Sequence, residues 1–127
     1  MPGSTPLILG FVISPTAPSL DGRRFVMESS TASAVDADSP SRFRYSEQDG
    51  VVWGDYDGDT VTFGRFVGTR VGDVLNVSFA HVMVNNGAVV TGTSASLVEG
   101  SAGDGVRLVE NFRIGDVEHV SICVESE

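Results

Sequence analysis

The sequence predicts an all-β domain in which an antiparallel meander closes into a barrel of about eight strands. Three observations lead to this prediction. Turn-forming pairs recur at short intervals from residue 49 onward, the runs between them are rich in Val, Phe, Thr and Ile, and no stretch shows the i, i+3, i+4, i+7 apolar spacing of a helix. Because an open meander leaves two unpaired edge strands, closure into a barrel is the economical way to remove these edges.

The front of the chain differs from the rest. Residues 1–20 contain four of the five prolines, and six of the seven residues in the stretch 7–13 are apolar. A stretch this apolar does not stay in water without cost. We therefore expect residues 1–20 to form an arm that adds a strand, acts as a lid or plug over one barrel mouth, or forms an interface with a second subunit. The last alternative is compatible with a homodimer, and residues 21–127 form the barrel domain.

Eight strands follow in order. The first is predicted at residues 23–30, and a loop over 31–41 follows it. The second strand, at 42–48, begins the meander. Asp49-Gly50 and Asn86-Gly87 are typical of the turns that come next, because Asp-Gly and Asn-Gly supply the positive φ angles that tight hairpins need. The remaining strands are predicted at residues 51–56, 60–67, 74–84, 88–98, 106–112 and 117–125.

Alternation along the strands assigns side chains to the two faces of the barrel wall. In the fifth strand the bulkier set, predicted to face the lumen, is Leu75, Val77, Phe79, His81 and Met83. In the seventh strand the inward set is Val106, Leu108, Glu110 and Phe112. Glu110 is thus predicted to be a carboxylate among lumen hydrophobes.

The composition limits the partners. Seventeen acidic residues against eight basic ones give a formal net charge of −9, which repels phosphate backbones and disfavours nucleic acid as a partner. All eight basic residues are arginine. The chain shows no signal-peptide pattern and no run of eighteen apolar residues, so we expect a cytoplasmic protein with no membrane partner.

No metal or cofactor is expected. Cys123 is the single cysteine, so no intramolecular disulfide forms, and the two histidines do not complete a zinc site with it. Asp55, Asp57 and Asp59 lack the glycine and the glutamate that complete an EF-hand loop, and we interpret them as a solvated turn. The sequence has no phosphate-binding loop and no flavin or nicotinamide fingerprint.

Short motifs are spread along the barrel region. They are Phe43-x-Tyr45, Trp53-Gly54-Asp55-Tyr56-x-Gly58, Phe63-Gly64-x-Phe66, Ala80-His81-Val82, Gly92-x-Ser94, Arg107-Leu108-x-Glu110 and Gly115-Asp116. In these motifs the sequence resembles, from about residue 21 to 125, small bacterial calycin-like proteins with an avidin-like barrel, whose members are often labelled N-acetylglutamate synthase. An acetyltransferase of that kind needs a Gly-rich turn that opens a helix, and the sequence offers neither. The resemblance implies a calycin/avidin-like barrel.

A barrel of eight strands is just wide enough to hold one small molecule, and an aromatic lumen suits a mainly apolar ligand held by a few polar contacts. We expect ligand contacts from Trp53, Tyr56, Arg65, Phe66, Phe79, Met83, Leu108 and Phe112. The candidate catalytic residues are Glu110, His81 and Tyr45. Glu110 is either a buried acid or base or a structural residue paired with Arg65 or Tyr45. His81 either contacts a ligand or is a core histidine.

Two functions fit this reading. The first is a cofactor-independent cyclase that folds an apolar, polyketide-like substrate into a reactive conformation, including a Diels–Alder-type ring closure. This function follows from the resemblance, because small calycin-like barrels act as cyclases on polyketide intermediates in bacteria. The alternative is a non-catalytic carrier of the lipocalin or avidin type. The apolar arm favours the cyclase, because a reaction vessel needs to exclude water more than a carrier does.

Overall fold

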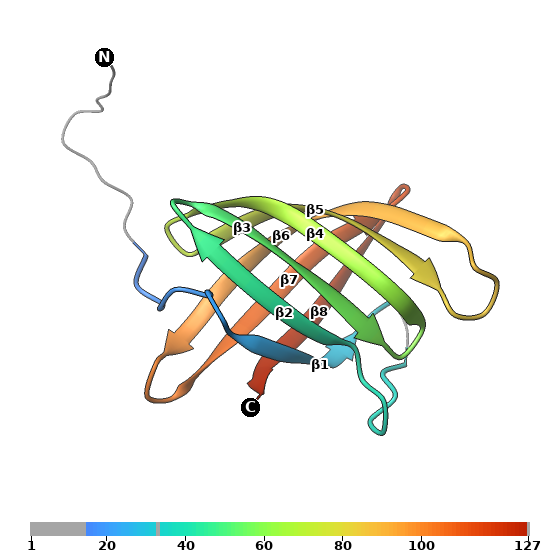
Figure 1. Ribbon diagram of the computed structural model, residues 1–127, viewed down its shortest axis with the longest axis horizontal. Helices are drawn as coiled ribbons and strands as arrows, with labels where there is room; N and C mark the ends of the chain where they lie inside the picture. Colours follow the sequence, from blue (N-terminus) through green and yellow to red (C-terminus); the bar gives the residue numbers. More distant parts are fainter. Residues whose placement is uncertain (1–14, 33, 127) are drawn as a thin grey trace, which may run out of the picture.

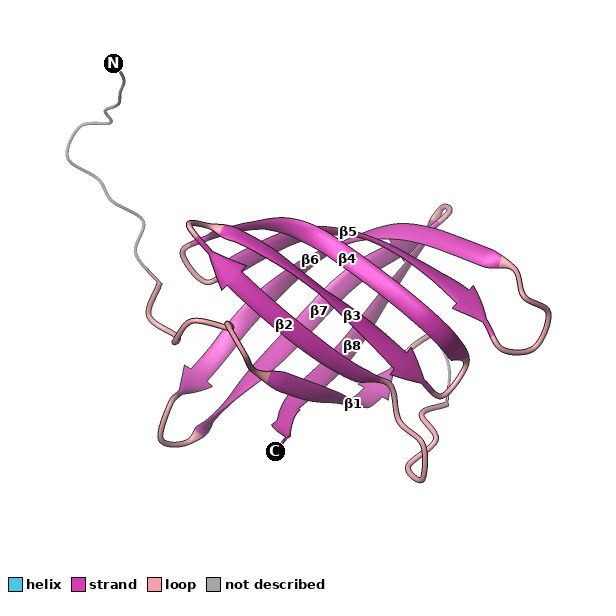
Figure 2. Ribbon diagram, in the orientation of Figure 1, coloured by secondary structure: helices cyan, strands magenta, loops and turns pink. Residues whose placement is uncertain are grey.

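The computed structural model describes residues 15–32 and 34–126 and contains eight β-strands. The strands are β1 (Arg24–Ser30), β2 (Arg42–Gln48), β3 (Val51–Gly58), β4 (Val61–Val71), β5 (Val74–Met83), β6 (Val89–Ser101), β7 (Gly105–Ile114) and β8 (Val117–Ser126). No helix occurs in the described residues, as Figure 2 shows, and therefore none of them forms a helix that could cross a membrane. The all-β prediction is confirmed.

Each strand pairs antiparallel with the next one in sequence, and β1 pairs with β8, which closes the barrel (Figure 1). Tight turns join the strands from β2 onward. At the β2–β3 turn, Asp49 and Gly50 have φ angles of 51° and 78°, which is the left-handed backbone that the Asp-Gly pair predicts. The antiparallel meander and its closure into a barrel, both predicted from the spacing of the turns, are therefore confirmed.

The strands β4 and β6 run further than the sequence indicates. The prediction ends the fourth strand at residue 67, before Gly68, but pairing with β5 continues from Gly68 opposite Val77 to Val71 opposite Val74. The sixth strand likewise continues beyond residue 98, and Ser101 pairs with Gly105. A glycine and polar residues weaken strand propensity locally, yet the ladder on both sides of each strand keeps them extended.

One end of the barrel is closed by the segment that leads into β1. Ala17 and Leu20 are buried in the hydrophobic core, and Leu20 has no exposed surface. The backbone amides of Thr16 and Ala17 donate to the Asp73 carboxylate at 3.0 Å. The Leu20 amide donates to Glu47 at 2.9 Å. Residues 16–20 thus seal this mouth, whereas the stretch 7–13 of the predicted arm lies outside the described residues.

Arg70 holds the closed end together. Its side chain is 3% exposed, and its guanidinium donates to the carbonyls of Ala17, Pro18 and Gly72 at 3.0, 2.9 and 2.8 Å. It also pairs with the Glu47 and Asp73 carboxylates at 3.0 and 3.2 Å. A buried guanidinium is tolerated only when its donors are satisfied and its charge is paired, and both conditions are met here.

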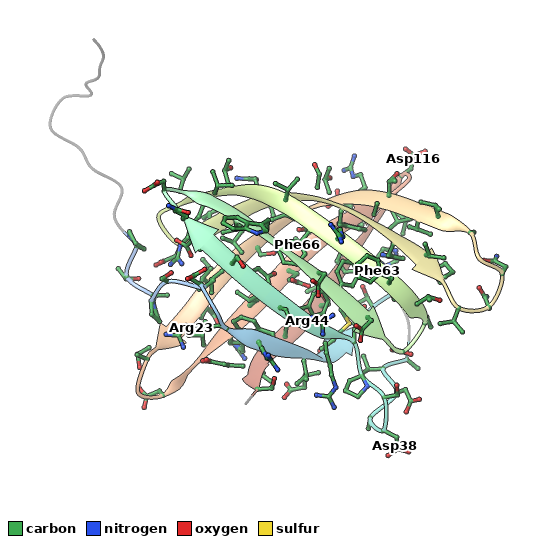
Figure 3. All side chains as sticks on the ribbon, viewed as in Figure 1. Arg23, Asp38, Arg44, Phe63, Phe66 and Asp116 are labelled. Carbon is green, nitrogen blue, oxygen red and sulfur yellow. The ribbon has the colours of Figure 1, made fainter. Side chains whose placement is uncertain are left out.

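Charged side chains on the barrel wall include Arg23 and Arg44, which Figure 3 labels. Arg44 forms ion pairs with Asp55 and Asp57 across β2 and β3. Asp55 and Asp57 are therefore not free metal ligands. No group of three or more His, Cys, Asp or Glu side chains in the described chain is arranged to hold a metal ion.

Candidate functional site

A cavity of about 340 Å³ occupies the open half of the barrel. All eight strands contribute to its wall, and its mouth lies at the end that carries the β1–β2 loop and the β3–β4 turn, where Asp59 and Thr60 line the rim. The wall is mainly apolar, because period-two alternation turns one bulky side of each strand inward. Beneath the cavity, in the closed half, Phe25, Val52, Leu75 and Leu108 are fully buried and fill the interior.

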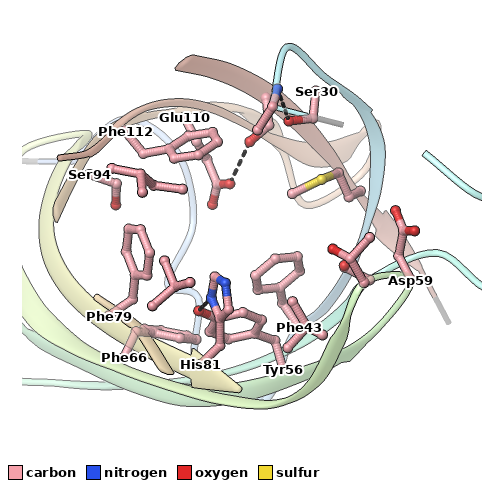
Figure 4. A pocket seen from close by; sticks show the side chains of 18 of the residues that line it. Ser30, Phe43, Tyr56, Asp59, Phe66, Phe79, His81, Ser94, Glu110 and Phe112 are labelled. Carbon is pink, nitrogen blue, oxygen red and sulfur yellow. Dashed lines mark hydrogen bonds between the residues drawn. The ribbon is translucent and has the colours of Figure 1, made fainter. Parts of the chain in front are cut away.

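Glu110 on β7 points into this cavity (Figure 4). The Ser121 hydroxyl donates a hydrogen bond to Glu110 Oε1 at 2.9 Å, and the Cys123 thiol donates to the same oxygen at 3.6 Å. Both donors lie on β8, and Ser121 is the cross-strand partner of Glu110. Burial raises the pKa of the Glu110 carboxyl, whereas the bonds from Ser121, Cys123 and Tyr45 oppose this rise.

The Glu110 carboxyl also affects the pKa values of Tyr45 and Cys123. The pKa of Tyr45 is raised well above its ordinary value, first by burial and then by the nearby Glu110 charge, and that of Cys123 is raised for the same two reasons. Both groups therefore stay protonated at neutral pH. In this neutral form neither group adds a negative charge beside Glu110, and the Cys123 thiol donates to its carboxyl.

The second polar group of the cavity is the pair Tyr56 and His81. The Tyr56 hydroxyl lies 2.7 Å from His81 Nδ1, so with the imidazole proton on Nε2 the hydroxyl donates to Nδ1. Burial lowers the pKa of His81, and burial together with the Glu110 charge raises the pKa of Tyr56. The pair is thus neutral at neutral pH and offers polar atoms without a charge.

The strand between Tyr56 and His81 makes this contact possible. In the ladder Gly64 of β4 stands between Tyr56 of β3 and His81 of β5. The Tyr56 ring lies over Gly64, where a Cβ atom would be 2.4 Å from the ring. The ring therefore crosses the intervening strand without obstruction. Phe79 supports the other side of His81, because the two rings stack with 4° between their planes.

Glu110 and the Tyr56–His81 pair face each other across the cavity in Figure 4. Aromatic rings complete the walls beside them, and Phe79 meets Phe112 edge to face with centroids 6.3 Å apart. A ligand that enters from the open mouth would therefore contact apolar surface on most sides. Its polar atoms would meet a carboxyl on one wall and a neutral phenol–imidazole pair on the other.

Most predicted site residues line the cavity. They are Tyr45, Tyr56, Phe66, Phe79, His81, Met83, Glu110 and Phe112. The inward faces predicted for the fifth and seventh strands are correct. Leu75, Val106 and Leu108 are buried in the core, and the other predicted residues of these two faces line the cavity, namely Val77, Phe79, His81, Met83, Glu110 and Phe112.

The predicted lumen positions of Trp53 and Arg65 are wrong. Trp53 is 42% exposed on the outer face, because its neighbours Val52 and Tyr56 follow the alternation that turns inward. Arg65 is also exposed, and its guanidinium lies 5.3 Å from the ring centroid of Phe63, another outer residue (labelled in Figure 3). Arg65 is therefore not the partner of Glu110.

Leu108 faces inward but does not line the cavity. It is fully buried in the packed half of the barrel, below the ligand-accessible space. Among the residues that the sequence analysis did not assign to the site are Phe43, Ser94 and Ser121, which line the cavity, and Cys123, which donates to Glu110. Alternation from Tyr45 indicates Phe43, but the serines and the cysteine become visible only through the strand register that places them beside Glu110 or across the lumen.

A family model described as avidin-like protein matches residues 18–126. The match covers all eight strands and begins within the segment that closes the barrel end. No curated protein and no solved structure gives a significant match to the chain.

Proposed function

Since the chain belongs to the avidin-like protein family, whose barrel is consistent with small-molecule binding, we propose that this protein binds a small, mainly apolar molecule in its cavity. The observation that carries the proposal is the cavity of about 340 Å³, which is closed at one end and lined by aromatic and aliphatic side chains. Ligand sites in proteins are typically cavities of roughly 300–1,000 Å³ with a few convergent polar groups.

The polar groups would orient the ligand. Glu110 and the Tyr56–His81 pair lie on facing walls and are separated by apolar surface. A hydrogen-bonding group on the ligand that reaches Glu110 would fix which end enters first. Buried polar groups that are left unpaired are costly, so the arrangement favours ligands whose few polar groups reach Glu110 or the Tyr56–His81 pair.

Fluorescence titration with N-phenyl-1-naphthylamine, an uncharged probe that brightens in apolar surroundings, tests this proposal. The variant Ser94→Phe places a ring in the cavity, and Thr93→Phe places the same ring on the outer face of the same strand. We expect the wild type and Thr93→Phe to bind the probe with one-to-one stoichiometry, and Ser94→Phe to bind at least about tenfold more weakly. Equal binding by all three proteins would place the probe outside the cavity and contradict the proposal.

A cofactor-independent cyclase is the second candidate, and the two facing polar groups are the observation that favours it. A Diels–Alder-type closure forms two carbon–carbon bonds from the π electrons of one bound substrate, so that no atom or electron is gained or lost. The cavity would hold the folded substrate, and protonated Glu110 or the Nε2–H of His81 would donate a hydrogen bond to a carbonyl on its electron-poor half.

An acyclic substrate with a tethered diene and activated alkene tests the cyclase directly. If the protein is a cyclase, it should close the ring faster than the uncatalysed reaction does. The Glu110→Gln variant should keep its fold, and its rate of ring closure should fall by on the order of 10²-fold or more. If the substrate binds in the cavity but closes at the uncatalysed rate, the protein is a carrier.

A further inference from the structure

Charge is distributed unevenly around the cavity. The ionisable side chains on its wall are Tyr45, Tyr56, Asp59, His81 and Glu110. The sequence contains no lysine, and all eight of its arginines lie within the described residues, yet none of them lines the cavity. The wall thus carries two carboxyl groups and no cation.

The arginines are engaged elsewhere. Arg70 is held at the closed end by three backbone carbonyls and two carboxylates. Four others form ion pairs away from the cavity, and these are Arg23, Arg44, Arg107 and Arg113. The remaining three, Arg24, Arg42 and Arg65, are exposed on the outer surface. No arginine side chain therefore lies in the lumen.

Glu110 has hydrogen-bond donors around it but, among the described residues, no cationic side chain beside it. This environment suits a carboxylate that pairs with a cation supplied by a ligand. Ser121 and Cys123 donate to Oε1, and the neighbouring Tyr45 hydroxyl also lowers the pKa of the carboxyl. These donors stabilise the ionised form, but buried charges in proteins are normally also paired with an opposite charge. Within the described part of the chain, no ion pair is formed by Glu110.

We propose that the ligand of this cavity carries a basic nitrogen that pairs with Glu110, and that the cavity rejects carboxylates and phosphates. This inference rests on the proposed small-molecule-binding function and names the chemical class of the ligand. The rest of the cavity is compatible with it. The Tyr56–His81 pair is neutral and does not repel a cation, and the rings of Phe79 and Phe112 offer faces that attract one.

Three naphthalenes that share one ring system and differ in one group test the inference. They are 1-naphthylmethylamine, 1-naphthalenemethanol and 1-naphthoate, which are cationic, neutral and anionic at pH 7.5. Affinity is measured by displacement of N-phenyl-1-naphthylamine and, independently, by calorimetry. We expect the amine to bind more tightly than the alcohol, and the carboxylate to bind about tenfold or more weakly than the amine, because its negative charge would lie beside the Glu110 carboxylate.

Two variants test which carboxyl group of the wall makes the cavity prefer a cationic ligand. Glu110→Gln should weaken binding of the amine by about tenfold and leave binding of the alcohol within about twofold. Asp59→Asn removes the other carboxyl of the wall, at the partly exposed rim, and should change amine binding by less than about threefold because water reaches it and screens its charge. The wild-type ligand series decides the question even if Glu110→Gln does not fold.

Two failures are distinguishable. If the three naphthalenes bind the wild type equally well, or 1-naphthoate binds best, the charge selection is wrong while the binding function stands. If neither the reporter nor any of the three binds, the small-molecule-binding function itself is wrong, and the inference falls with it.

Discussion

The Tyr56 hydroxyl contacts His81 Nδ1 at 2.7 Å across a strand to which neither residue belongs. The two residues lie on β3 and β5, and Gly64 of β4 stands between them in the ladder. An aromatic ring that spans a glycine is thus a positioning device of this barrel wall. It places a neutral phenol–imidazole pair on the wall that faces Glu110.

Gly64→Ala should disrupt this device. The added Cβ would be 2.4 Å from the Tyr56 ring, so the ring must move away from His81. We expect a loss of about 1–3 kcal/mol in the free energy of unfolding, as for other overpacked core sites, together with weaker binding of N-phenyl-1-naphthylamine. Urea unfolding and probe titration measure the two effects. The control Gly103→Ala adds a Cβ that meets nothing within 4 Å, and an equal effect there would refute the role of Gly64.

His81 should make stability depend on pH. Burial lowers its pKa in the folded state below the unfolded value of about 6.5. The unfolded chain then binds more protons, so the contribution of neutral His81 is complete above pH 6.5 and is lost as the pH falls through that value. Because His81 is only half-buried, the loss at pH 5.5 should stay below about 1.4 kcal/mol, the full value for one pH unit.

Urea unfolding at pH 7.5 and 5.5 measures this contribution in wild type and in His81→Asn. Glu110, whose pKa is raised in the folded state, favours folding as the pH falls and so acts in the opposite direction. Tyr45, Tyr56 and Cys123 keep their protons over this range. The variant should therefore lose less stability than the wild type on acidification, and a larger loss in the variant would show that the sign is wrong.

Arg70→Met should destabilise the closed end. The change leaves the carbonyls of Ala17, Pro18 and Gly72 without their donor, and the Glu47 carboxylate without its cation. Loss of one partner from a buried ion pair typically costs about 3–5 kcal/mol. The matched variant Arg107→Met removes an exposed pair with Glu99, which should cost less than about 1 kcal/mol. Equal unfolding midpoints for the two variants would contradict this assignment.

Truncation separates the two parts of the N-terminal segment. Deletion of residues 1–20 removes Ala17 and Leu20 from the core and the backbone partners of Arg70, so we expect it to destabilise the barrel. Deletion of residues 1–14 keeps all of these contacts. If the lid predicted for the arm lies at residues 6–13, this deletion should give faster release of N-phenyl-1-naphthylamine with an unchanged unfolding midpoint, measured by stopped-flow dilution. An unchanged release rate would rule out a lid.

The fold was predictable because its signals are local. Asp49-Gly50 and the other turn pairs set the hairpins, and alternation in β5 and β7 assigns His81 and Glu110 to the lumen. The placement of Trp53 failed because β3 has glycine at position 54, where a bulky inward residue would have revealed the phase of the strand. Because Trp53 stands between Val52 and Gly54, the sequence around it shows no alternation of bulky and polar residues that would tell whether its side chain faces the lumen or the outer surface.

The partners of Glu110 were not predictable from local patterns. Ser121 and Cys123 become its donors through the register between β7 and β8, and that register depends on the turn at Gly115 and on closure of the barrel. The sealing of one mouth likewise depends on a contact between Arg70 and Pro18, which are 52 positions apart in the sequence. Such contacts follow from the closed topology and not from any single strand.

A crystal structure of the protein with N-phenyl-1-naphthylamine tests the central claim most directly. The account predicts one probe molecule inside the barrel, between Glu110 and His81 and in contact with Phe79. The outer tryptophan, Trp53, should remain free of probe. Probe found only on the outer face near Trp53, with side chains collapsed into the lumen, would contradict a ligand-binding cavity.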